Sequence, residues 1–254
     1  MAAGRGDTDP VARHFGTTHK CLAEVSGTAI LDRVIKSLDE STMIASTVLC
    51  IEDDAPIDQL PYTTTAILRG SCRRITSERS AAASAKAVLQ ACASDLPLLI
   101  VTGDHPLLST EMINYFCRAA TDLGDVVVGL TRADTVLSAY PESVRTLLRF
   151  SDGPFCGCNL YAFNTTDASA ATRFWERAER SRKRPWRLIA MFGLRALLRY
   201  VLGHLELEQA IDRVSKQLGI RVNTVLLPWP EAAIDVDKPA DLTLAEAILE
   251  RTNS

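Results

Sequence analysis

The chain has 254 residues, of which 47% are hydrophobic and 23% charged, a composition ordinary for a soluble globular protein. The formal net charge of -3 gives no general attraction to nucleic acid or to an anionic membrane. No apolar run is long enough to span a membrane, and the N-terminus lacks the pattern of a signal peptide. The seven cysteines are an odd number and are scattered, which favours reduced thiols and a cytoplasmic protein over a disulfide framework.

A glycine-rich loop, AGRG, occupies residues 3–6. Such loops expose backbone N–H groups that can wrap a phosphate, and they normally follow a buried strand. Only Met1 and Ala2 precede this loop, so either the first strand is very short or Met1 is an internal methionine of a longer protein. Lys20 follows in a loop, where its ammonium could reach the same phosphates or could be a solvated surface charge.

The first half of the chain alternates between helical and strand patterns from about residue 25 to residue 130, which predicts a right-handed, mostly parallel α/β sheet. Ser80 is expected to cap an Ala-rich helix, and an acidic loop is expected at 52–54. The expected helices cover 30–38, 81–93 and 111–120, and the expected strands cover 46–51, 64–69, 98–102 and 126–130.

The segment LLIVTGDHPLL, residues 98–108, combines a continuous apolar run with an abrupt Gly-Asp-His-Pro turn. The run is typical of a strand buried on both faces, and the turn places Asp104 at its carboxyl end, where open α/β sheets bind ligands. Asp104 is therefore a candidate functional carboxylate, with a plain turn residue as the alternative. His105, beside it, is expected to make a structural hydrogen bond.

The second half contains longer helical blocks and fewer strands. The short strands at 149–150 and 160–163 are expected to flank a turn at 152–154 and a glycine-bearing segment at 155–159. The basic run around 177–187 is typical of a solvated helix face, with anion binding as the alternative. Further elements are expected at 169–182, 185–202, 207–218 (capped by Gly219), 222–227 and a closing helix ending near Leu249.

The order of four segments resembles that of the MobA-like nucleotidyltransferases: AAGRG, then HK-C-L-x-x-V-x-G, then TGDHPLL, then IDVDKPADL. The resemblance covers the chain from Ala2 to about Leu249. It implies a GT-A-type fold, a three-layer α/β/α arrangement with a mostly parallel twisted sheet. It also implies a single domain over 1–254, with a nucleotide-binding half at 1–130 and an acceptor-side elaboration at 145–225.

The family's chemistry is the transfer of a nucleotidyl group from an NTP to a phosphorylated or hydroxyl-bearing small molecule, with Mg²⁺ and release of pyrophosphate. The resemblance implies Lys20 and Arg5 as catalytic residues and Asp104 and Asp237 as metal ligands, with Asp235 a nearby candidate. The residues implied for nucleotide binding are Ala3, Gly4, Arg5, Gly6, Lys20, Ser80, Ser84 and Asp104. Gly157 and Asn159 correspond to an acceptor-side loop.

These motifs say less about which nucleotide base the protein binds and about its oligomeric state. The lack of a recognisable guanine-reading pattern favours CTP, and a homodimer is left open. No nucleic acid partner and no membrane span are expected. The stretch at 7–10 departs from the family's usual continuation of the glycine loop, so Arg5 or Arg13 is expected to supply the missing positive charge.

Two other functions stay open for this fold. A glycosyltransferase that uses an NDP-sugar typically carries D-x-D at the central strand end, whereas this chain has Gly103-Asp104-His105. A catalytically silent nucleotide-binding module is the other alternative, because so little sequence precedes the glycine loop. A dehydrogenase is disfavoured, because AGRG lacks the dinucleotide spacing.

Overall fold

The computed structural model describes residues 9–180 and 194–252. The chain forms two compact units. The first unit comprises residues 9–79, 101–118 and 234–252, and the second comprises residues 80–100, 119–180 and 194–233. Within the described residues no helix combines the length and the hydrophobicity that a membrane crossing requires.

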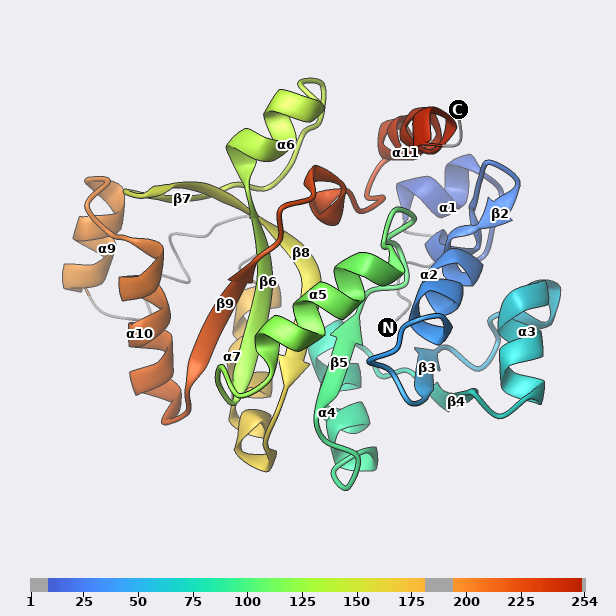
Figure 1. The fold of residues 1–254 in the computed structure, drawn as a ribbon, viewed down its shortest axis with the longest axis horizontal. Helices are drawn as coiled ribbons and strands as arrows, with labels where there is room; N and C mark the ends of the chain where they lie inside the picture. Colours follow the sequence, from blue (N-terminus) through green and yellow to red (C-terminus); the bar gives the residue numbers. More distant parts are fainter. Residues whose placement is uncertain (1–8, 181–193, 253–254) are drawn as a thin grey trace. The chain divides into compact units, whose positions relative to one another are not determined.

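The first unit contains five helices and two short strand pairs among its described residues (Figure 1). The helices are α1 (Pro10–His14), α2 (Ile30–Asp39), α3 (Pro61–Leu68), α5 (Thr110–Ala120), whose last two residues belong to the second unit, and α11 (Pro239–Thr252). The strands are β1 (Glu24–Val25), β2 (Thr28–Ala29), β3 (Thr47–Ile51) and β4 (Cys72–Thr76), and two 3₁₀ turns are η1 (Lys20–Leu22) and η2 (Ile57–Gln59).

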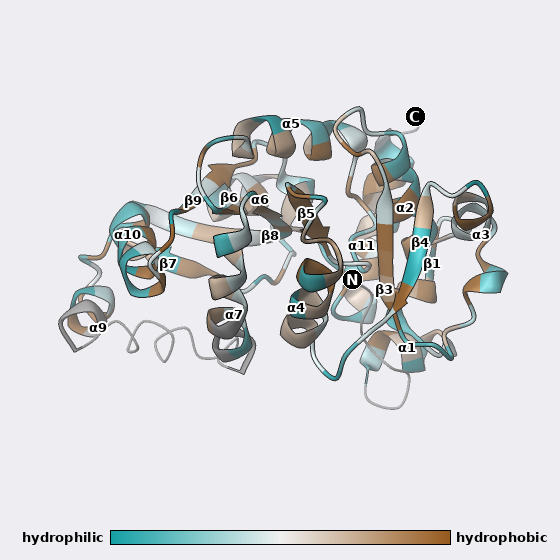
Figure 2. Cartoon of the chain, turned by 90° about the horizontal axis from the view of Figure 1, so that it is seen from below, coloured by the Kyte–Doolittle hydropathy of each residue, from teal (hydrophilic) through white to brown (hydrophobic). Residues whose placement is uncertain are grey.

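The predicted helix at 30–38 is confirmed as α2, and its apolar stripe is buried as expected. Leu31 and Ile35 pack in one core cluster with Leu49 and Ile51 of β3. β3 and β4 pair in parallel, and Figure 2 shows β3 as hydrophobic and part of β4 as hydrophilic. The carboxyl ends of this pair therefore lie at one edge, where Glu52 continues the chain after β3.

The predicted strand at 64–69 is wrong, because helix α3 covers residues up to Leu68, Arg69 caps its C-terminus, and the strand follows as β4. Pro61 stands at the first position of α3, where its missing N–H costs nothing. The buried Asp32 of α2 accepts hydrogen bonds from the Thr63 N–H (2.8 Å), the Thr63 hydroxyl (2.7 Å) and the Tyr62 N–H (3.2 Å). A carboxylate from a neighbouring helix thus caps α3, which the threonine-rich segment did not reveal.

The second unit is built on a sheet with the strand order β5-β8-β6-β9, and β7 pairs with β8. β6 runs parallel to β9 and antiparallel to β8, so this sheet is mixed. The strands are β5 (Leu98–Val101, its last residue in the first unit), β6 (Val126–Arg132), β7 (Leu148–Phe150), β8 (Gly153–Phe163) and β9 (Val222–Leu226). The helices are α4 (Ala81–Ala91), α6 (Ala133–Ala139), α7 (Ala171–Arg180), α9 (Leu194–Val201) and α10 (Leu207–Leu218), with 3₁₀ turns η3 (Thr166–Ala170) and η4 (Pro230–Ala233).

The expected helix caps of the second unit are confirmed. The Ser80 hydroxyl accepts a hydrogen bond from the Ala83 N–H at the start of α4, and Gly219 ends α10 with a φ of 70°. The strand expected at 160–163 is longer than predicted, because the glycine-bearing segment at 155–159 belongs to the same strand, β8. A register irregularity opposite Val128 and Leu130 interrupts the β6–β8 pairing, and Asn159 has a positive φ of 53°.

Helix α3 should depend on the carboxylate that caps it. We expect Asp32→Ala to lower the free energy of unfolding by about 3 kcal/mol, because the buried Thr63 N–H and hydroxyl lose their acceptor. Asp58→Ala, at an exposed position in η2, is the control and should change stability by less than about 0.5 kcal/mol. Urea denaturation of both variants measures the difference, and equal stabilities would contradict this account of α3.

Candidate functional site

Lys20 lies in a tight turn of the first unit and is buried, with 6% of its surface exposed. The turn η1 is closed by hydrogen bonds from the Leu22 N–H to the His19 carbonyl and from the Ala23 N–H to the Lys20 carbonyl, both 3.1 Å. A lysine this deeply buried needs a charged partner. The alternative of a solvated surface lysine is therefore excluded.

The ammonium of Lys20 has two carboxylate partners. Its Nζ lies 2.6 Å from Oδ2 of Asp104 and 3.1 Å from Oδ1 of Asp237. The side chain of Asp104 is 16% exposed, whereas that of Asp237 is 39% exposed. These three residues were expected at the site, and the structure brings them together from three distant segments of the sequence.

Asp104 follows β5, and its backbone is joined to the segment that carries the other aspartates. The Val236 N–H donates a 3.0 Å hydrogen bond to the Asp104 carbonyl. Oδ1 of Asp104 is buried and receives no hydrogen bond of good geometry from any residue that the structure describes. A buried carboxylate oxygen without a donor is costly, unless a ligand such as a cation meets it.

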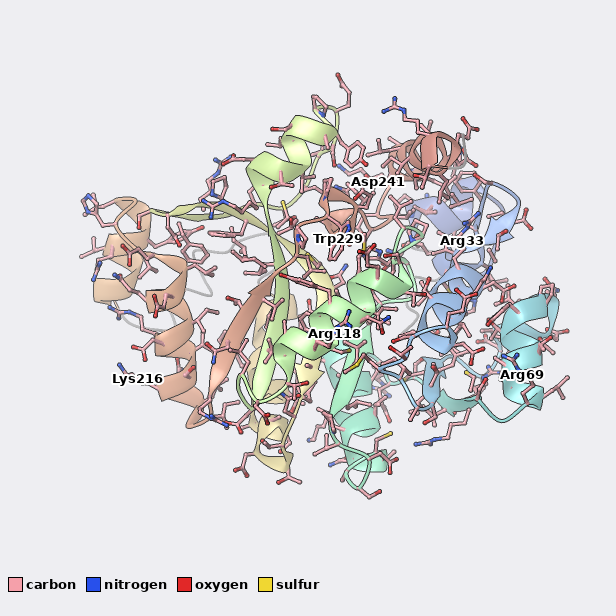
Figure 3. The ribbon with its side chains drawn as sticks, viewed as in Figure 1. Arg33, Arg69, Arg118, Lys216, Trp229 and Asp241 are labelled. Atoms are coloured by element: carbon pink, nitrogen blue, oxygen red, sulfur yellow. The ribbon has the colours of Figure 1, made fainter. Side chains whose placement is uncertain are left out.

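Asp241 fixes the backbone of Asp237. It lies in the first turn of α11, is 8% exposed and is labelled in Figure 3. Its Oδ2 accepts hydrogen bonds from the N–H groups of Asp237 (3.0 Å) and Lys238 (2.8 Å), as an acidic side chain in the first turn of a helix commonly does. This role of Asp241 was not expected from the sequence, although an aspartate three residues after the residue preceding a helix is a readable capping signal.

Three carboxylates converge beside the single Lys20 ammonium. One oxygen from each of Asp104, Asp235 and Asp237 lies within 4.8 Å of the others. Among the residues that the structure describes, these three carboxylates outnumber the one buried ammonium beside them, and a divalent cation would neutralise the excess negative charge. Carboxylate oxygens are the ligands that Mg²⁺ prefers. The donor set and the unpartnered Oδ1 of Asp104 therefore fit a hard divalent cation.

Lys20 and Asp104 hold each other in the ionised state. Burial opposes a charge on Lys20, but the carboxylates of Asp104 and Asp237 prevail and raise the pKa of its ammonium. Burial likewise disfavours a charge on Asp104, but the Lys20 ammonium keeps the pKa of this carboxyl below its usual value. Burial and the Asp104 charge raise the pKa of the Cys21 thiol to about 12, so this thiol is protonated and not a nucleophile.

The other expected site residues divide into two groups. The glycine loop with Ala3, Gly4, Arg5 and Gly6 lies outside the described residues. Ser80, Ser84, Gly157 and Asn159 belong to the second unit, where Ser80 caps α4, Ser84 is buried in that helix and the other two lie in β8. Their roles in binding nucleotide and acceptor stay predictions. Arg13 is exposed at the end of α1, and His105 is buried beside Asp104.

Comparison with known proteins defines the class of this chain. A curated relative, the 2-C-methyl-D-erythritol 4-phosphate cytidylyltransferase of Frankia casuarinae (strain DSM 45818 / CECT 9043 / HFP020203 / CcI3), is 28% identical over 257 residues, which cover 98% of this chain and 79% of the relative. The family profile of the MobA-like NTP transferase domain matches residues 1–222. The protein is thus a nucleotidyltransferase. The chain belongs to the MobA-like NTP transferase family.

Two solved structures share the fold. A hypothetical transferase from Thermus thermophilus superposes with a TM-score of 0.75 at 24% identity, covering 95% of this chain and 96% of that one. The 4-diphosphocytidyl-2C-methyl-D-erythritol synthase of Anaerococcus prevotii DSM 20548 gives a TM-score of 0.55 at 14% identity, covering 90% and 88%. The expected α/β fold class is confirmed.

Removing the Lys20 ammonium should reverse the pH dependence that this cluster contributes to stability. In the wild type, the lowered pKa of Asp104 contributes to the free energy of unfolding. This contribution is fully present at pH values above the ordinary pKa of an aspartate, and it is lost as the pH falls through the lowered pKa of the folded state. In Lys20→Met, burial and the neighbouring carboxylates should instead raise that pKa above its unfolded value. The native state then binds more protons than the unfolded state, so stability falls as the pH rises through the raised value.

Urea denaturation between pH 4 and pH 8 tests this reversal. The gap in unfolding free energy between the wild type and Lys20→Met should widen as the pH rises, because the raised pKa of Lys20 keeps the wild-type pair intact over this range. A gap that stays constant with pH would contradict the proposed charge balance.

Proposed function

We propose that the protein transfers the cytidylyl group of CTP to a phosphorylated or hydroxyl-bearing small molecule and releases pyrophosphate, with Mg²⁺ as cofactor. The observation that carries this proposal is the convergence of Lys20 with Asp104 and Asp237, at distances of 2.6 Å and 3.1 Å. The membership of the family supplies the reaction class. The choice of CTP is supported by the name of the curated relative, a cytidylyltransferase.

The chemistry requires stabilisation of negative charge more than proton transfer. An oxygen of the acceptor attacks the α-phosphorus of CTP, a new P–O bond forms, and the bond to the bridging oxygen of the departing pyrophosphate breaks. Charge accumulates on the non-bridging oxygens and on the leaving group, so fixed cations and N–H donors lower the barrier most. A phosphate acceptor is already ionised at neutral pH, so positioning can replace a general base.

Asp104 and Asp237 would hold the Mg²⁺, with Asp235 as a third candidate ligand. When bound, the cation supplies Lewis-acid stabilisation of the phosphate oxygens. Lys20 orients both carboxylates through its ion pairs and adds a permanent positive charge beside them. Asp241 keeps Asp237 in place through its backbone. In this proposal the glycine loop at 3–6 contacts the triphosphate, as the family resemblance implies.

An assay of pyrophosphate release tests the proposal. It combines each of the four NTPs and Mg²⁺ with a panel of sugar, polyol and cofactor phosphates. We expect turnover with CTP, and a fall of at least about 100-fold in Asp104→Asn, since a cation ligand is lost. Asp212→Asn is the matched control, because this carboxylate of α10 is exposed and its ion pair is with the likewise exposed Lys216 of the same helix.

Three results would contradict the proposal. These are the absence of transfer by the wild type across the panel, turnover with another NTP but not with CTP, and unchanged turnover in Asp104→Asn. Transfer of the sugar from an NDP-sugar to an acceptor, with release of the nucleoside diphosphate and no pyrophosphate, would instead identify a glycosyltransferase.

A further inference from the structure

A buried histidine directly precedes Lys20 in the first unit. His19 is 3% exposed, and its Nδ1 lies 3.0 Å from the Thr18 hydroxyl. On the other side of the ring, Nε2 lies 3.5 Å from Oε2 of Glu52. A buried ring with two polar nitrogens needs partners on both sides. The Thr18 hydroxyl lies at hydrogen-bond distance from Nδ1, whereas the Glu52 carboxylate faces Nε2 at the 3.5 Å of an ion pair and not in a hydrogen bond.

Glu52 is attached firmly to the carboxyl end of β3. Its carbonyl accepts hydrogen bonds from the Arg74 guanidinium of β4 and from the Ala55 N–H. Its side chain is 21% exposed, and its Oε2 is buried. The acidic loop noted in the sequence therefore carries one carboxylate that faces the protein interior rather than solvent.

The backbone of His19 anchors the turn that carries Lys20. The His19 carbonyl accepts hydrogen bonds from the Leu22 N–H (3.1 Å) and from the Thr17 hydroxyl (3.0 Å). A shift of the His19 ring would therefore move the turn and change where the Lys20 ammonium lies.

We propose that His19 and Glu52 are positioning residues for Lys20. The pair ties the Lys20 turn to the end of the β3–β4 pair, and so keeps the ammonium at its distances from Asp104 and Asp237. The effect on catalysis rests on the role of Lys20 in the proposed function. The positioning itself is a property of the fold that does not require turnover.

Two substitutions of His19 separate its two contacts. Gln places its side-chain nitrogen near the position of Nε2 and can still donate toward Glu52, whereas Asn reaches only the region of Nδ1 and Thr18. We expect His19→Asn to lower kcat about tenfold, equivalent to about 1.4 kcal/mol, with little change in KM for the nucleotide. His19→Gln should retain most of the wild-type kcat.

A readout independent of activity is the reactivity of the Lys20 amine. Acetylation by an N-hydroxysuccinimide ester, followed by mass spectrometry, should be slow at the buried Lys20 of the wild type and of His19→Gln. In His19→Asn it should be faster by about fivefold or more, because the turn opens locally. The exposed Lys216 of α10 is the internal reference and should react equally in all variants.

Two variants of the acidic loop at 52–54 provide a test substitution and its matched control. Glu52→Ala should reproduce the effects of His19→Asn, and combining the two should add little, since both remove the same contact. Asp53→Ala, which removes a neighbouring carboxylate bonded to the Thr76 hydroxyl, should leave kcat and Lys20 labelling unchanged.

Any of three results would overturn the inference. The first is an equal loss of kcat in His19→Asn and His19→Gln, and the second is additive effects of His19→Asn and Glu52→Ala. The third is Lys20 labelling at the wild-type rate in both His19→Asn and Glu52→Ala. If His19→Asn fails to fold, Glu52→Ala and Asp53→Ala give the same comparison at partly exposed and exposed positions. An inactive wild type would refute the proposed function alone, and the labelling series would then decide the positioning role.

Discussion

The paired contact of Lys20 with Asp104 and Asp237 is the constraint on which the first unit depends most. A lysine with 6% of its surface exposed is stable only because two carboxylates lie 2.6 Å and 3.1 Å from its ammonium. The carboxylates depend on the ammonium in the same way, since Asp104 would otherwise be a buried charge beside two others. Folding therefore brings the start, the middle and the end of the chain together at one point.

The fold supplies each of these charges with a rigid support. The turn η1 holds Lys20, the hydrogen bond from the Val236 N–H holds Asp104, and Asp241 holds Asp237 through the backbone. Such support keeps the carboxylates close despite their repulsion, which is the usual requirement of a cation site in a nucleotidyl-transfer enzyme. The same supports explain why a positive charge stays in place beside the reacting phosphates in the proposed reaction.

Much of this fold could be read from the sequence where the signal is local. The buried stripe of α2, the Ser80 cap and the left-handed Gly219 each follow from a pattern within a few residues. The failures have tertiary causes. Residues 61–68 form helix α3, whose first turn is capped by Asp32 of another helix. Strand β8 continues through its glycine-bearing segment, where it pairs with β6. The order of motifs predicted Lys20, Asp104 and Asp237 as site residues, but not their direct ion pairs. His19 was not singled out, since its contact with Glu52 joins residues 33 positions apart.

The central claim is that the carboxylates around Lys20 form a divalent-cation site. Calorimetric titration of Mg²⁺ into the wild type, Asp104→Asn and the exposed control Asp212→Asn tests it most directly. The account predicts that the wild type and Asp212→Asn bind the cation alike and that Asp104→Asn binds it at least about tenfold more weakly, a difference of about 1.4 kcal/mol. Equal affinity in Asp104→Asn, or no binding by the wild type, would contradict it.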